Sequence, residues 1–206
     1  MDSWWRAETM DQVFECQEIF RALMRAMSGP GQVIEVSRTS PGGKSLLQAV
    51  CETLLDQEVG LAAVGRAVDS SFVREISLST GCFCTSVKEA GFILVGGGSS
   101  EGALAHASRG TLDYPDQGAT VIYPVEKLGS GDLRLILKGP GIRDTCKTEI
   151  TGMDVTELEL SAELSSEFPL GLDLIFVDKR SIMAIPRSTE FVSIGSAGQQ
   201  TKRAEN

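Results

Sequence analysis

The stretch SEFPLGLDLIFVDKRSIMAIPRSTEF, residues 166–191, consists of two apolar runs joined by a charged turn at 178–180. Short apolar runs bounded by turn-forming residues are typical of buried strands, so this stretch predicts a strand pair inside a sheet. Asp173 interrupts the first run, and Arg187 lies in the polar cluster that closes the second. A buried carboxylate is costly unless it is paired. We expect Asp173 to pair with Arg187, to face a polar seam or to belong to a binding site, and we favour the structural pair.

Helical and strand patterns alternate in the first half of the chain, and strand patterns dominate after residue 120. The spacing of apolar residues predicts helices over 10–28 (with a cap at Thr9), 44–56, around 72–78, 99–107 (a short one) and 155–166. It predicts strands over 32–36, 59–64, 91–95, 119–128 and 132–142. In the first helix, one apolar stripe is expected to face the core, and it consists of Val13, Cys16, Phe20, Leu23, Met24 and Met27.

This order of elements favours a single α/β domain of three layers, with a mixed central sheet covered by helices on both faces. The domain is expected to span residues 1–194. Residues 195–206 are polar and lack periodicity, which predicts a disordered tail.

The composition narrows the possible classes of function. The chain has 206 residues, of which 42% are hydrophobic and 23% charged, as in a globular protein. Its formal charge of -9 argues against nucleic acid as a partner. No apolar run approaches the roughly 20 residues of a membrane-spanning helix, and no signal peptide pattern is present, so we expect a cytoplasmic protein without membrane contact. The 5 cysteines are irregularly spaced and are expected to be buried thiols.

The segment FILVGGGSSEGALAHASRG, residues 92–110, is the most suggestive motif because a strand enters a glycine cluster before a helix. Such a turn can bind phosphate through backbone amides. However, Glu101 stands where a dinucleotide fingerprint needs glycine, and Ala103 stands where a P-loop needs lysine. A strand-to-helix turn is therefore the favoured interpretation. His106 is the only histidine, and no nucleophile turn or metal-ligand spacing accompanies it, so no metal site or catalytic residue is assigned.

Three segments together resemble the PhnH family, whose members are subunits of the bacterial carbon-phosphorus lyase core complex. They are FRALMRAMSGPGQV at 20–33, LRLILKGPGI at 133–142 and EFPLGLDLIFVDKRSIMAIPRST at 167–189. The resemblance implies a role in alkylphosphonate catabolism together with the G, I and J subunits. It also implies a homodimer and a fold similar to a reduced pyridoxal-phosphate-dependent transferase without the cofactor site.

The residues are compatible with the absence of this cofactor. A pyridoxal enzyme needs a lysine for its Schiff base and an acid at the pyridinium nitrogen. No lysine here lies in a small-residue Ser-x-x-Lys setting, and no iron-sulfur spacing of cysteines is present. We therefore expect no cofactor, although a surviving pyridoxal enzyme remains a third hypothesis.

The leading hypothesis is an auxiliary subunit of the phosphonate-processing complex, without an active site of its own. The alternative is a subunit that binds phosphate or a phosphonate ester. Its candidate donors are Arg21, Arg25, Lys138 and Arg187, with Asp173 beside the last of them.

Overall fold

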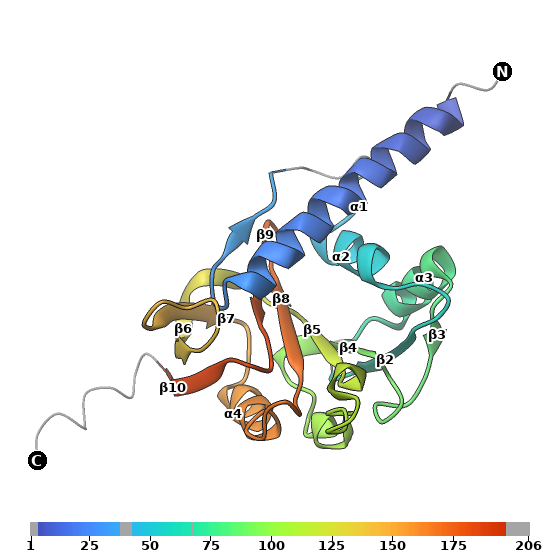
Figure 1. Ribbon diagram of the computed structural model, residues 1–206. Helices are drawn as coiled ribbons and strands as arrows, with labels where there is room; N and C mark the ends of the chain where they lie inside the picture. Colours follow the sequence, from blue (N-terminus) through green and yellow to red (C-terminus); the bar gives the residue numbers. More distant parts are fainter. Residues whose placement is uncertain (1–3, 38–42, 67, 197–206) are drawn as a thin grey trace, which may run out of the picture.

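The computed structural model describes residues 4–37, 43–66 and 68–196 (Figure 1). Its helices are α1 (Trp4–Ser28), α2 (Leu46–Leu54), α3 (Ser70–Thr80) and α4 (Val155–Leu164), with three short 3-10 turns η1 (Gly96–Gly98), η2 (Ala103–His106) and η3 (Pro115–Gln117). Its strands are β1 (Ile34–Glu35), β2 (Gly60–Val64), β3 (Phe83–Cys84), β4 (Phe92–Val95), β5 (Thr120–Pro124), β6 (Lys127–Lys138), β7 (Cys146–Thr151), β8 (Asp173–Val177), β9 (Ser181–Ile185) and β10 (Glu190–Ser196).

The central sheet has seven strands in the order β1-β9-β8-β5-β4-β2-β3. Strands β3, β2, β4, β5 and β8 run parallel to one another, whereas β9 is antiparallel to both β8 and β1. The strand pair predicted from residues 166–191 is confirmed, because β8 and β9 pair directly with Leu174 opposite Ile185. Since β8 also pairs with β5, it has neighbours on both edges, which suits its continuous apolar sequence.

The ends of the helices follow local sequence signals. The side chains of Ser45, Asp69 and Asp154 accept hydrogen bonds from the first turns of α2, α3 and α4. Helix α3 ends at Gly81, whose φ of 80° is easily adopted by glycine. The expected cap at Thr9 is wrong, since α1 begins at Trp4 and passes through Thr9 without interruption.

One face of the central sheet is covered by helices. Alternate strand residues, including Leu94, Ile122 and Ile175, pack against buried residues of α1, α2 and α3. This face matches the expected helical layer. Figure 1 shows α1 crossing this side of the sheet and continuing beyond the body of the molecule.

The opposite face departs from the expectation of a purely helical layer. It is covered by α4 together with a three-stranded antiparallel sheet of order β10-β6-β7. In β6, Leu133, Leu135 and Leu137 point into this core and the residues between them are more exposed. Such a one-sided strand must bury its apolar face, and a second sheet on the first satisfies that need. The structure thus confirms an α/β protein with a mixed sheet and corrects one of its covering layers.

The stripe of α1 that was expected to face the core does so only in part. Leu23 is buried and Cys16 and Met27 are half-buried, whereas the expectation is wrong for the exposed Val13, Phe20 and Met24. The other buried residues of α1 include Ile19, Ala22 and Ala26, which pack with Leu23 toward β9 and α2. Small alanine side chains let the helix approach the sheet closely, so the larger side chains of the neighbouring stripe remain outside.

The expectation that the cysteines are buried holds for Cys51 and Cys82 but is wrong for Cys84, which is exposed. Burial, with smaller contributions from the nearby Cys82 and Glu52, raises the pKa of the Cys51 thiol from 9.0 to about 12. The folded state therefore favours the protonated thiol. The resulting stabilisation is complete below about pH 9 and is lost as the pH rises toward about 12, by roughly 1.4 kcal/mol per pH unit.

We therefore expect the free energy of unfolding to fall less in the Cys51→Ala variant than in the wild type when the pH is raised from about 8 to about 11. Urea unfolding at both pH values measures the difference, and Cys84→Ala is the matched control because its thiol is exposed. Equal pH dependence in the wild type and Cys51→Ala would contradict the assignment.

Candidate functional site

Asp173 and Arg187 form the ion pair that the sequence favoured. The antiparallel pairing of β8 with β9 brings the first residue of β8 close to the residue two places after β9. The backbone N–H of Arg187 donates to Oδ1 of Asp173 at 2.9 Å, and its Nε and Nη2 donate to Oδ2 at 3.1 and 2.5 Å. The side chains of Arg187 and Asp173 are only 14% and 17% exposed. The pair is therefore part of the structure of the strand ends.

The remaining donors of Arg187 bind the loop that precedes β5. Nη1 donates to the carbonyl of Pro115, and Nη2 donates to the carbonyl of Gly118 at 3.3 Å. A Cβ atom on Gly118 would collide with Nη1, so this close approach requires glycine. The guanidinium thus ties the start of β8 and the loop before β5 to the segment that follows β9, and its donors are used inside the protein.

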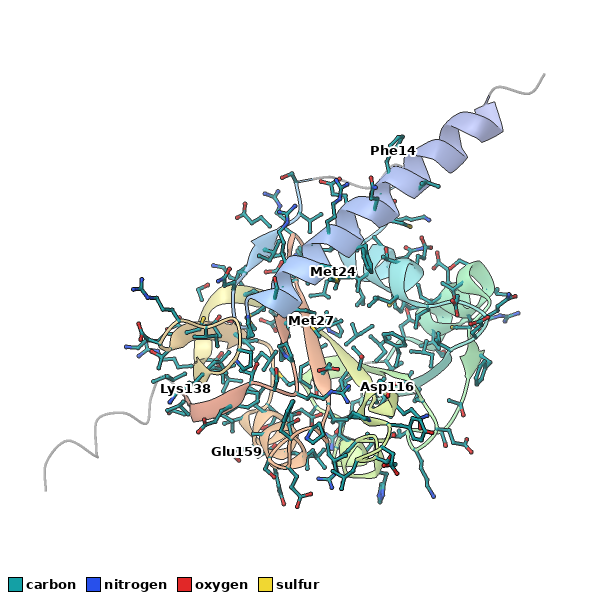
Figure 2. All side chains as sticks on the ribbon, in the orientation of Figure 1. Phe14, Met24, Met27, Asp116, Lys138 and Glu159 are labelled. Atoms are coloured by element: carbon teal, nitrogen blue, oxygen red, sulfur yellow. The ribbon has the colours of Figure 1, made fainter. Side chains whose placement is uncertain are left out.

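The other three candidate donors do not join this pair. Arg21 and Arg25 are exposed one turn apart on α1, and Lys138 is exposed at the end of β6, opposite Glu190. Figure 2 shows Lys138 on the other side of the molecule from Asp116, which follows the Pro115 bound by Arg187. In the described part of the chain, no hydrogen bond or ion pair links Arg21, Arg25 or Lys138 to Arg187. The five residues do not form one ligand site, so the phosphate-binding alternative is not favoured.

A buried acid that sequence reasoning missed holds the glycine turn in place. Oε2 of Glu157, in α4, accepts hydrogen bonds from the backbone N–H and the Oγ of Ser100, both at 3.0 Å. Its Oε1 accepts a hydrogen bond from the hydroxyl of Tyr123 at 3.0 Å. All three residues are buried. Burial, with Glu157 nearby, raises the pKa of Tyr123 well above its usual range, so its hydroxyl remains a donor.

This arrangement supports the interpretation of residues 92–110 as a structural turn. A phosphate at this turn would compete with the carboxylate of Glu157 for the N–H of Ser100, and like charges repel. The expected helix over 99–107 is reduced to η2, which follows Gly102. His106 is exposed and belongs to neither buried network. In the sequence, Glu157 stands three residues after Asp154, where an acid usually indicates a local capping box.

A groove of about 880 Å³ lies between residues 31–33 and the β6–β7 hairpin. Arg134 and Glu149 on its wall form an ion pair at 2.9 Å between Nε and Oε1. None of the five candidate residues lines this groove. Among the residues that the structure describes, no three histidine, cysteine or acidic side chains are grouped so that they could hold a metal ion. The groove therefore adds no support to a phosphate site.

Large apolar side chains are exposed along α1. Val13, Phe20 and Met24 recur on one stripe, and Phe14 lies beside it; their exposed fractions run from 51% to 61%. Figure 2 labels Phe14 and Met24 on this helix, whose first turns extend beyond the body of the protein. Contiguous exposed apolar side chains are typical of surfaces that bind other chains. The fold and these surfaces define a mixed-sheet α/β protein suited to association with other proteins.

The chain belongs to the PhnH family: residues 7–192 match the family described as bacterial phosphonate metabolism protein (PhnH). It is 35% identical over 173 residues to the "Putative C-P lyase subunit protein HtxG" of Stutzerimonas stutzeri, covering 84% of each chain. It is 30% identical over 184 residues to the "Alpha-D-ribose 1-methylphosphonate 5-triphosphate synthase subunit PhnH" of Rhizobium meliloti (strain 1021), covering 87% of this chain and 92% of the relative. The family resemblance carried by the three sequence segments is confirmed.

The helices of the described residues were also compared in length and apolar character with a bilayer-spanning helix. None of them combines the length and the apolar character needed to cross a bilayer. Strand β10 continues to Ser196, and the rest of the expected tail, residues 197–206, lies outside the described residues.

Proposed function

We propose that this chain is a subunit of a carbon-phosphorus lyase complex and acts in the cytoplasm in the use of alkylphosphonates as a phosphorus source. The observation that carries the proposal is similarity over most of the chain to two relatives, one named as a putative C-P lyase subunit and the other as a subunit of a synthase that makes a methylphosphonate compound. The similarity covers at least 84% of each relative, so it is not confined to a shared fragment.

The subunit is proposed to have no independent active site. Asp173 and Arg187 bind each other, and Glu157 is hydrogen-bonded to Ser100 and Tyr123. These buried charged groups hold loops in place and leave little capacity for a substrate. The same contacts support an auxiliary role in which the reaction takes place on other subunits.

The fold is proposed to be a reduced pyridoxal-phosphate-dependent transferase fold without its cofactor. A mixed sheet with a helical layer is compatible with this origin. A Schiff base needs a lysine inside a pocket. In the described part of the chain, Lys44 is paired with Glu52 at 2.7 Å, and the other lysines are exposed. These lysine positions do not fit such a site.

The proposed partners are a second copy of this chain and the G, I and J subunits. The exposed stripe of α1 supports association, because burying Phe20 and Met24 would remove large apolar surfaces from water. Arg21 and Arg25 lie next to this stripe and would provide charged contacts at its rim.

Co-expression of this chain with the other subunits of its complex tests the proposal. We expect the wild-type chain to co-purify with them and to be dimeric on its own by light scattering. The variant Phe20→Ser/Met24→Ser is expected to lose dimerisation, whereas Leu78→Ser, which changes a side chain that is 77% exposed on α3, should not. A wild-type chain that never associates with the other subunits would overturn the proposed function.

A further inference from the structure

Two loops at the amino ends of β5 and β8 expose a second group of large apolar side chains. Leu112 and Tyr114 lie in the loop before β5 and are 76% and 59% exposed. Phe168 lies in the loop before β8 and is 67% exposed. Exposed side chains of this size are common anchors in protein interfaces, aromatic residues above all. None of them belongs to α1 or to the buried polar networks.

The two loops are joined to each other. The backbone N–H of Gly171 donates to the carbonyl of Arg109 at 3.0 Å. The guanidinium of Arg109 donates from Nη1 to the carbonyl of Leu164 and from Nη2 to Oε2 of Glu167, both at 3.3 Å. Glu167 directly precedes Phe168, so Arg109 links the base of the first loop to the residue beside Phe168. The exposed side chains therefore stand on one connected base.

The first loop also has a fixed shape. Thr111 and Tyr114 exchange backbone hydrogen bonds of 3.1 and 3.2 Å, which places Leu112 and Asp113 at the tip of a tight turn. Arg187 binds the carbonyls of Pro115 and Gly118 behind this turn. A loop held in this way loses little conformational entropy when it binds, so its apolar side chains are pre-organised for a partner.

The charges around these side chains indicate the kind of partner. Asp113 and Asp116 are exposed acids on the first loop, and Glu167 on the second loop is exposed but paired with Arg109. The guanidinium groups of the two arginines of the region, Arg109 and Arg187, donate to carbonyls and acids of the chain itself. The surface presented to solvent is therefore apolar and acidic, and a basic surface would complement it.

We infer that the loop surface, formed by Leu112, Tyr114 and Phe168 with the acids Asp113 and Asp116, docks into an apolar pocket on another subunit of the complex, and that lysine or arginine side chains border this pocket. The inference rests on the proposed function. A second copy of this chain is disfavoured as the occupant, because a symmetric contact would bring acids against acids. Contact with Arg21 and Arg25 of another copy would be head-to-tail, which produces a ring or an open chain.

Binding of the full-length chain to the purified subcomplex of the other subunits tests this inference. We expect the variant Leu112→Ser/Tyr114→Ser/Phe168→Ser to bind at least about tenfold more weakly than the wild type. Leu78→Ser is the matched apolar control and should bind within about twofold. Added salt should weaken the binding of the variant Asp113→Asn/Asp116→Asn less than it weakens the binding of the wild type. Asp144→Asn, which neutralises an exposed acid on another loop, should leave this salt dependence unchanged.

Thermal unfolding and light scattering of the same variants complete the test, because the substituted side chains are exposed and native folding is expected. Wild-type affinity in the folded triple variant would overturn the inference and leave the proposed function intact. If the triple variant lost self-association but still bound the partner subunits, the occupant would be a second copy of this chain, and the inference would again be overturned. Failure of the wild type to bind the subcomplex would overturn both proposals.

Discussion

The substitution Glu157→Ala is expected to lower the free energy of unfolding by about 4 kcal/mol, the largest single effect that the structure predicts. It would leave the backbone N–H and hydroxyl of Ser100 and the hydroxyl of Tyr123 without their acceptor inside the protein. Each unsatisfied buried donor costs about 1–3 kcal/mol, and a partly filled cavity adds to this. Urea unfolding followed by circular dichroism measures the change.

Two further variants sharpen this prediction. Glu157→Gln retains the shape and one oxygen acceptor but directs an amide toward a donor, so an intermediate loss of about 2 kcal/mol is expected. Glu159→Ala changes an acid that is exposed on the same helix (Figure 2) and should stay within about 0.5 kcal/mol of the wild type. If Glu157→Ala unfolded at the same urea concentration as Glu159→Ala, the assigned role of Glu157 would be wrong.

Asp173→Ala is expected to cost about 3 kcal/mol, the second largest effect. The change removes the counter-charge of a mostly buried guanidinium and leaves the backbone N–H of Arg187 without its acceptor. The residual solvent exposure of both side chains keeps the loss below that of a fully buried pair. Urea unfolding gives the global effect, and limited proteolysis within residues 109–118 reports whether the loop held by Arg187 opens.

The controls separate the ion pair from a general loss of charge. Asp144→Ala removes an exposed acid and should change neither stability nor proteolysis. Arg187→Lys keeps the charge but loses the planar group that binds Asp173, Pro115 and Gly118 together, so it should also expose the loop to proteolysis. Wild-type protease resistance in Asp173→Ala would contradict the idea that this pair holds the loop.

Local sequence patterns were sufficient to predict those strands whose apolar residues follow a clear pattern of burial. The run that forms β8 is apolar throughout because strands lie on both of its edges and cores lie on both of its faces. Strand β6 has only one buried face, and the alternation of Leu133, Leu135 and Leu137 with more exposed residues predicted it. The sequence did not predict β7, since CKTEIT carries few apolar residues to identify it as a strand.

The candidate site could be predicted only where the chain itself brings residues together. Asp173 and Arg187 flank one antiparallel strand pair, so their contact follows from the pairing of β8 with β9. The bonds of Glu157 to Ser100 and Tyr123 join residues 57 and 34 positions apart, through the packing of α4 on the sheet. Periodicity within α4 carries no information about which distant donor its acid will meet.

The sequence by itself determined the α/β class, the central strand pair and the family, and it favoured the ion pair at the end of the strand pair, because these depend on short-range patterns and on specific segments. Only the tertiary structure decided which stripe of α1 is buried. The stripe with Ala22 and Ala26 lies against the sheet, and the stripe with Phe20 and Met24 remains exposed. Both stripes are apolar, and the choice between them follows from how closely a helix can approach the sheet, which depends on packing between segments that are distant in the chain.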